Sequence, residues 1–195
     1  IPPLNLRGLD ANRDFSRYDN SQDLATFVDL QQDILVMALS TGLSHVASLM
    51  IGHADWQLAP FGPESDQRNA YGQASGQAQI PYVAWYMERL AKLLAKLRVM
   101  PGVSRGSLLD ETYVVTYSNI GKLSDLSFDR LPMILAGGQG FTHKPSVKDY
   151  KSSAEPLAGV WASTAQVANV PLENFGEAYT AGGKGNGPIY GLWEA

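Results

Sequence analysis

Apolar residues recur with a helical period in three stretches of the chain. Residues 21–41 form the first, with Ser21 as a candidate N-cap and Gly42 as the stop. The second begins at Ile80 and is stopped by Pro101 and Gly102, and residues 157–170 form the third. The apolar face of the first predicted helix comprises Leu24, Phe27, Val28, Ile34, Leu35 and Ala38. The stripe of the second comprises Ile80, Val83, Ala84, Met87, Leu90, Leu94 and Leu97.

Three shorter apolar runs predict strands. They cover residues 45–51, 113–117 and 131–136, and β-branched, aromatic and aliphatic residues dominate them. The first run is short and almost uninterrupted, which indicates a buried strand. Residues 53–79 between it and the second helix are polar and glycine-rich, so they predict a long loop.

The order of these elements predicts one α/β domain, in which a layered sheet is flanked by helices. We expect residues 1–20 to form an irregular N-terminal segment, residues 21–180 the domain, and residues 181–195 a glycine-rich tail. The chain begins with Ile1, which indicates a processed or partial product.

Composition narrows the function classes. Hydrophobic residues make up 45% of the 195 positions and charged residues 17%, as in globular proteins. The formal net charge of −4 argues against sequence-independent binding to nucleic acid. No apolar run is long enough to span a membrane. Cysteine is absent, which excludes disulfides and thiolate chemistry and is compatible with an oxidising compartment.

Charge along the second helix has two interpretations. Glu88 is spaced to pair with Lys92, and Lys96 and Arg98 favour the negative end of the helix dipole. The same basic stripe is compatible with an anionic partner. We expect a solvated helix end.

Two glycine clusters resemble nucleotide-binding motifs but lack their essential parts. Gly137, Gly138 and Gly140 follow a predicted strand, as in the G-x-G-x-x-G fingerprint of dinucleotide-binding proteins. The last glycine of that fingerprint is missing here, and so is the helix that should follow it. The cluster at residues 182–187 lacks the phosphate-loop spacing. Both clusters predict turns. No G-x-S-x-G elbow signals a serine nucleophile.

Histidine is present three times, and one copy has a neighbouring carboxylate. His53 and Asp55 follow the predicted strand at 45–51, where open α/β sheets place their sites. The two side chains could share a metal ion, although two candidate ligands do not complete a site. His45 opens that strand and predicts a packed or capping role, and His143 lies in a polar loop.

Five segments in this order resemble one family of exported bacterial proteins. They are residues 29–39, 44–52, 108–118, 131–138 and 171–176. Together they are similar to the C-terminal part of the family known as domain of unknown function 1552, over residues 22–180. The resemblance implies an alkaline-phosphatase-like fold, with a central sheet and metals at its strand ends. It also implies export to the periplasm or cell surface.

The chain departs from that pattern at the implied metal ligands. A strand such as 113–118 typically runs into Asp-His or Asp-Asn in the superfamily, and here Asn119 and Ile120 follow it. Residues 72–77 and 123–127 lack the histidines expected there. Asp125 and Asp129 either replace the missing metal ligands or are surface carboxylates. The superfamily's nucleophile belongs to an N-terminal half that this chain does not show.

We therefore expect a non-catalytic structural or binding subunit of a periplasmic or cell-surface assembly, with other protein subunits as partners and no cofactor. The alternative is a fragment of a metal-dependent phosphate- or sulfate-ester hydrolase, with a divalent metal at His53, Asp55 and Asn119. A carbohydrate-binding module is a third possibility. We also expect the tail, with Tyr190 and Trp193, to dock on a neighbour. The aromatic residues behind these expectations are Trp56, Trp85, Tyr86, Trp161, Tyr179, Tyr190 and Trp193.

Overall fold

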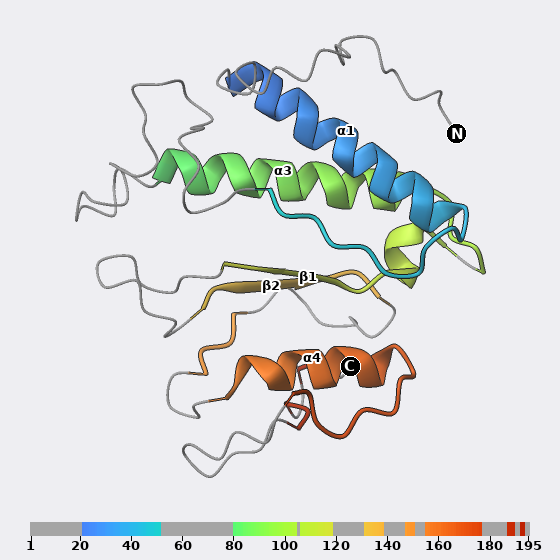
Figure 1. The fold of residues 1–195 in the computed structure, drawn as a ribbon, viewed down its shortest axis with the longest axis vertical. Coiled ribbons are helices and arrows are strands. Elements are labelled where there is room, and N and C mark those ends of the chain that lie inside the picture. Colours follow the sequence, from blue (N-terminus) through green and yellow to red (C-terminus); the bar gives the residue numbers. More distant parts are fainter. Residues whose placement is uncertain are drawn as a thin grey trace. The chain divides into compact units, whose positions relative to one another are not determined.

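The computed structural model describes residues 21–51, 80–104, 106–118, 131–138, 147–150, 155–176, 187–189 and 192–193. The chain divides into two compact units, each described by itself below. Unit 1 comprises residues 1–108 and 123–125, and unit 2 comprises residues 109–122 and 126–195. The described elements combine helix and strand, as the sequence predicts (Figure 1).

Unit 1 is built on two helices that pack against each other. Helix α1 spans Ser21–Ser40 and helix α3 spans Ile80–Val99, so both predicted helices are confirmed (Figure 1). Leu24 and Val28 of α1 meet Trp85 of α3 in a buried cluster. Burial of such side chains contributes roughly 1.5–3 kcal/mol each to folding. Neither helix in the described residues is long and apolar enough to cross a membrane.

Part of each predicted apolar stripe faces water. Ile34 of α1 and Val83 and Met87 of α3 are exposed, whereas Leu90 and Leu97 are buried as expected. The two helices meet along narrow seams, so apolar residues at the edge of a stripe stay outside the contact. The end of α1 agrees with the prediction. Gly42 follows the helix with φ +68° and donates its N–H to the Leu39 carbonyl.

The predicted strand at residues 45–51 is wrong. These residues are irregular, and Val46 is 83% exposed. Within the described part of the chain, they have no strand neighbour, and a strand needs one to satisfy its backbone donors and acceptors. His45 is exposed here and does not have the packed position expected of it.

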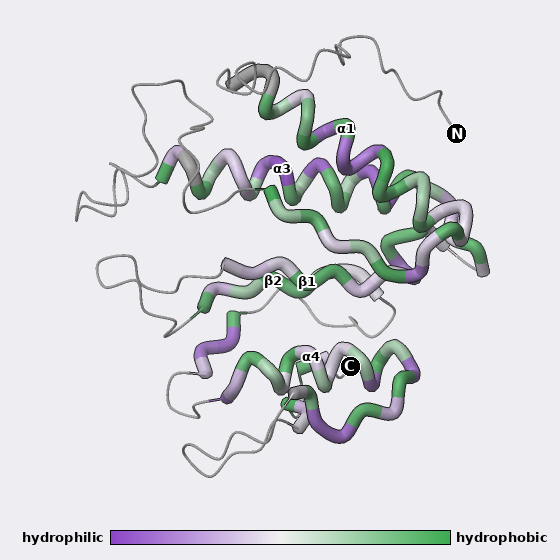
Figure 2. The backbone as a smooth tube through the Cα atoms, viewed as in Figure 1, coloured by the Kyte–Doolittle hydropathy of each residue, from purple (hydrophilic) through white to green (hydrophobic). Residues whose placement is uncertain are grey.

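Unit 2 contains two short antiparallel strands. Strand β1 spans Val114–Tyr117 and β2 spans Met133–Ala136, with Val114 opposite Ala136 and Tyr117 opposite Met133. Both strands are confirmed, but the described sheet has these two strands only and is not the larger layered sheet expected. Figure 2 shows β2 coloured hydrophobic along its length. Strand β1 is preceded in the chain by the short 3₁₀ helix η3, Leu108–Glu111, whose first residue belongs to unit 1.

Two glycines fix the end of β2. Gly137 and Gly138 both have φ +73°, and Gly138 donates its N–H to the Leu109 carbonyl at 2.9 Å. A Cβ at Gly137 would overlap the Thr112 carbonyl oxygen, and one at Gly138 would overlap the Tyr113 ring. Both glycines are therefore required for a close-packed turn, as predicted.

Helix α4 spans Leu157–Val167 and ends three residues before residue 170, the predicted end of this helix. Asn169 takes a left-handed conformation with φ 60°. Its N–H bonds to the Gln166 carbonyl, and the Val170 N–H bonds to the Ala165 carbonyl. This pair of bonds is a Schellman motif, in which asparagine stands where glycine is usual.

The C-terminal segment packs on α4 of its own unit. Gly159 leaves room for Ile189, whose N–H donates to Ser163 Oγ at 2.8 Å. Trp193 is buried, stacks edge-on against Tyr113 and donates its indole N–H to Thr164 Oγ1. The expected docking of Trp193 on a neighbouring protein is therefore wrong, because this side chain belongs to the core of unit 2. Tyr190 lies outside the described residues.

Candidate functional site

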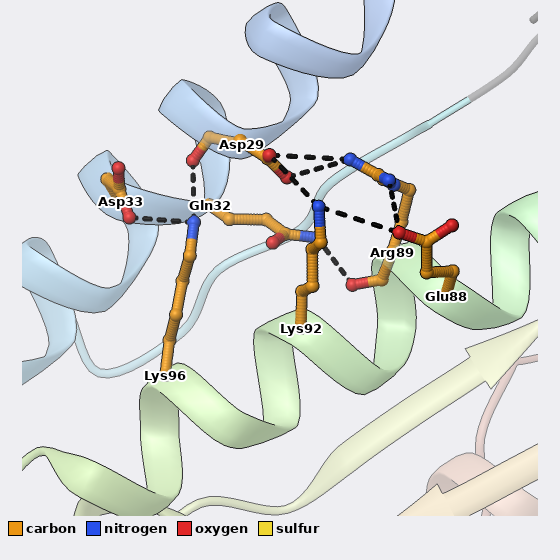
Figure 3. A network of polar contacts seen from close by, with 7 residues as sticks. All are labelled: Asp29, Gln32, Asp33, Glu88, Arg89, Lys92 and Lys96. Atoms are coloured by element: carbon orange, nitrogen blue, oxygen red, sulfur yellow. Dashed lines mark hydrogen bonds and ion pairs between the residues drawn. The ribbon is translucent and has the colours of Figure 1, made fainter.

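A network of charged and polar side chains joins α1 to α3 in unit 1 (Figure 3). At its centre lies Arg89, which is 5% exposed. The Arg89 guanidinium donates to both carboxylate oxygens of Asp29, at 3.2 and 3.3 Å, and to Glu88 Oε1 at 2.7 Å. Its Cζ lies 5.2 Å from the ring centroid of Trp85, within the range of a cation–π contact.

Lysines of α3 complete the network. Lys96 forms an ion pair with Asp33 at 2.7 Å and donates to the Asp29 carbonyl at 2.9 Å. Lys92 lies 3.5 Å from Asp29 and 3.6 Å from Glu88, which confirms the predicted pairing with Glu88. Three cations therefore face three carboxylates. Lys92 and Lys96 therefore contact α1 rather than forming a purely solvated helix end.

Gln32 is the most buried polar side chain of the network, with 0% exposure. Its Nε2 donates to the Arg89 carbonyl at 2.8 Å, whereas Gln32 Oε1 and Arg89 Nε are buried without a hydrogen-bond partner. A misaligned α1 and α3 would leave still more buried polar atoms unpaired, each at a cost of about 1–3 kcal/mol. The network therefore favours one alignment of the two helices.

The predicted metal ligands cannot be placed. His53, Asp55 and Asn119 lie outside the described residues, as do His143, Asp125 and Asp129. No group of three or more histidine, aspartate or glutamate side chains that could hold a metal occurs among the residues that the structure describes. The metal site therefore stays a prediction.

Unit 2 carries a row of aromatic rings that come from three separate parts of the chain. Tyr117 ends β1, Trp161 lies in α4, and Phe175 lies in the segment after α4. The Tyr117 and Trp161 ring centroids are 5.8 Å apart at 84°, an edge-to-face contact. Those of Trp161 and Phe175 are 6.3 Å apart at 36°. We call these three residues the aromatic row.

The two ends of the aromatic row are open to solvent. Tyr117 is 49% exposed and Phe175 is 46% exposed, while Trp161 between them is half-buried. Trp161 thus packs against the rings of Tyr117 and Phe175, which keep much of their surface exposed to solvent. Aromatic rings that are fixed by packing and exposed to solvent are available for stacking on a partner.

The turn that leads from α4 towards Phe175 borders a hollow. Gln166, Asn169, Val170 and Pro171 line this open hollow of about 240 Å³. Its walls offer two amide side chains and two apolar ones, and no ionisable group. This lining suits hydrogen bonding to neutral polar groups better than proton transfer.

The titration of Tyr150 in unit 2 is perturbed. Burial raises the pKa of Tyr150 above its usual value of 10.0, and the negative charge of Glu155 raises it further. A tyrosine that holds its proton more tightly remains neutral at physiological pH.

Sequence reasoning missed parts of both sites. Trp161 was among the aromatic residues expected at an interface, but Tyr117 and Phe175 were not. Tyr117 was assigned to a strand, and Phe175 is a lone aromatic residue in a polar segment. Gln32 could have been found by its spacing, because it lies at the same i+4 interval as the buried Leu24, Val28 and Val36.

No protein-family model matches this chain, and no curated protein or solved structure is significantly similar to it.

Proposed function

We propose that this chain is a non-catalytic binding subunit that contacts another component of a periplasmic or cell-surface assembly through the aromatic row. The observation that carries the proposal is the exposure of Tyr117 and Phe175 on either side of Trp161. Rigid aromatic side chains lose little conformational entropy on binding and dominate the energetics of many interfaces.

The chemistry of the described residues supports a binding role. The charged side chains of the unit 1 network form ion pairs with one another, which suits structural alignment of α1 and α3. The hollow beside α4 is lined by Gln166, Asn169, Val170 and Pro171, and none of these side chains is an acid, a base or a nucleophile. Both sites therefore offer contacts.

The family resemblance supplies the finer part of the proposal. On that resemblance, the chain is a degenerate C-terminal part of an alkaline-phosphatase-like fold, exported to the periplasm or cell surface. The alternative function is a metal-dependent hydrolase of phosphate or sulfate esters that uses His53, Asp55 and Asn119. No described residue favours this alternative over the binding role.

Site-specific photocrosslinking in the cells that produce the protein tests the binding role. A photoreactive benzoylphenylalanine is placed at position 117 or 175, where it preserves an aromatic side chain. Matched controls carry it at Val147 and Leu43, which are 98% and 84% exposed and lie outside the row. We expect adducts from positions 117 and 175 at several times the yield of the controls.

Equal yields at all four positions would contradict the proposal, because they would show exposure without a partner. Release of phosphate or sulfate from aryl esters by the purified protein, lost on His53→Ala, would establish the hydrolase instead.

A further inference from the structure

The segment that follows α1 has the composition of a strand, yet it has no neighbouring strand in the described part of the chain. Figure 1 shows residues 45–51 as an extended cyan trace. Among the residues that the structure describes, the backbone N–H and C=O groups of residues 47–51 form no hydrogen bond. Val46 is 83% exposed and Met50 is 73% exposed. An open strand edge that carries exposed apolar side chains is a template for pairing with another strand.

Alternate side chains of the segment differ in exposure. Leu49 and Ile51 are half-buried, and Ile51 packs against the buried cluster between α1 and α3. Val46 and Met50 occupy the other set of alternate positions and are exposed. This period of two is that of a strand with one face on a core. Contact with the two helices therefore holds the segment in place before a second strand arrives, which lowers the entropic cost of pairing.

The hydroxyl group of Ser44 determines which backbone groups remain available. Ser44 Oγ accepts a hydrogen bond from the Val46 N–H at 3.3 Å and donates one to the Val46 carbonyl. In an antiparallel pair, positions that exchange interstrand hydrogen bonds alternate with positions that make none. Val46 therefore suits a position without interstrand bonds, and the open backbone groups at residues 47, 49 and 51 suit the bonded positions.

We propose that residues 45–51 pair antiparallel with the same residues of a second copy of this chain, about a two-fold axis at Ser48. This register places Val46 opposite the partner's Met50, at a position without interstrand bonds. The residues that exchange bonds are then those whose backbone groups are open. The inference goes beyond the proposed function, because it concerns unit 1 and not the aromatic row.

The segment is complementary to itself in this register. Because the register decides which side chains meet across a strand pair, the segment's own residues determine the match. Residues 45–51 contain no Asp, Glu, Lys or Arg, so no two like charges of these types face each other. His45 lies opposite the partner's Ile51 rather than the partner's His45. A contact about a two-fold axis requires this self-complementarity, which favours a second copy as the occupant.

Cysteine crosslinking of the whole chain tests the register, because the chain has no cysteine of its own. Two residues directly opposite each other at a position without interstrand bonds have Cα atoms about 4.5 Å apart, within the range of a disulfide. We expect Ser48→Cys to form a disulfide-linked dimer under mild oxidation, at several times the yield of Leu43→Cys. Leu43 is 84% exposed, but this register places its two copies roughly 30 Å apart. Equal yields, or no dimer from Ser48→Cys, would overturn the inference.

Paired charge substitutions distinguish strand pairing from non-specific apolar association. Val46→Lys with Met50→Lys places like charges opposite each other, whereas Val46→Glu with Met50→Lys places opposite charges there. Both double variants replace the same two exposed side chains. Sedimentation velocity over a range of concentrations should show a reversible dimer for the parent. The dimer dissociation constant should be about tenfold higher for the Lys/Lys variant than for the Glu/Lys variant.

Circular dichroism of each variant checks that unit 1 remains folded, because α1 and α3 supply much of the helical signal. A parent chain that stays monomeric at every concentration would overturn the inference. So would equal dissociation constants for the two double variants, because they would show association without this register. Photocrosslinking through the aromatic row uses unit 2, so the failure of either proposal leaves the other standing.

Discussion

The ring of Trp161 in α4 lies 6.3 Å from that of Phe175, although the helix ends and the chain reverses between them. The reversal depends on Asn169, whose left-handed backbone closes α4 with two hydrogen bonds. The position of Phe175 therefore follows from how the helix ends.

Removing the Asp29 carboxylate should destabilise unit 1 more than removing that of Asp33. Asp29→Asn takes the closest α1 counterion from buried Arg89, and we expect a loss of about 1–2 kcal/mol in the free energy of unfolding. Asp33 pairs with the more exposed Lys96, so Asp33→Asn should cost less than about 0.5 kcal/mol. Urea denaturation measures both. Equal losses would show that Arg89 does not depend on Asp29.

Gly137 and Gly176 should respond differently to the same substitution. Both have positive φ, but only Gly137 lacks room for a Cβ. Gly176→Ala should cost about 1 kcal/mol for backbone strain alone. Gly137→Ala should cost at least about 2 kcal/mol more because of the overlap with the Thr112 carbonyl. Thermal unfolding compares the two variants, and similar losses would contradict the close approach at Gly137.

Trp193 should behave as a core residue. Trp193→Ala removes a buried ring that stacks on Tyr113, and we expect it to cost about 3–5 kcal/mol. Trp193→Phe retains a ring but loses the hydrogen bond to Thr164, so it should cost less than half as much. Denaturant unfolding provides the comparison. A Trp193→Ala variant as stable as the parent would place this side chain outside the core.

The titration of Tyr150 should depend on Glu155. Burial and the Glu155 charge both raise the Tyr150 pKa, so Glu155→Gln should lower it towards 10.0. Because the folded-state pKa is the raised one, the associated stability is present below pH 10 and is lost as pH rises through the folded pKa. Ultraviolet absorbance, with Tyr150→Phe as the subtraction control, measures this pKa. An unchanged value in Glu155→Gln would exclude the charge effect.

Local patterns predicted the elements well. The helical period gave α1, α3 and α4, and β-branched runs gave β1 and β2. Gly42 and Gly137 ended their elements as expected because few other residues adopt positive φ without strain. The end of α4 was misplaced because asparagine, not glycine, takes the left-handed position.

Contacts between residues far apart in the chain could not be predicted from local sequence patterns. Residues 45–51 have the composition of a buried strand, yet strand formation requires a neighbour, which composition does not supply. Gln32 is an exception, because its i+4 spacing from the buried Val28 and Val36 places it on the buried face of α1. The aromatic row joins Tyr117, Trp161 and Phe175 through tertiary contacts that no local period encodes.

The central claim is that the aromatic row is a binding surface, and the ratio of photocrosslinking yields at positions 175 and 147 tests it most directly. Val147 is 98% exposed and Phe175 is 46% exposed, so exposure alone predicts a yield at least as high from position 147. We predict an adduct several times more abundant from position 175 in cells that produce the protein. A ratio near one would contradict a binding role for the row.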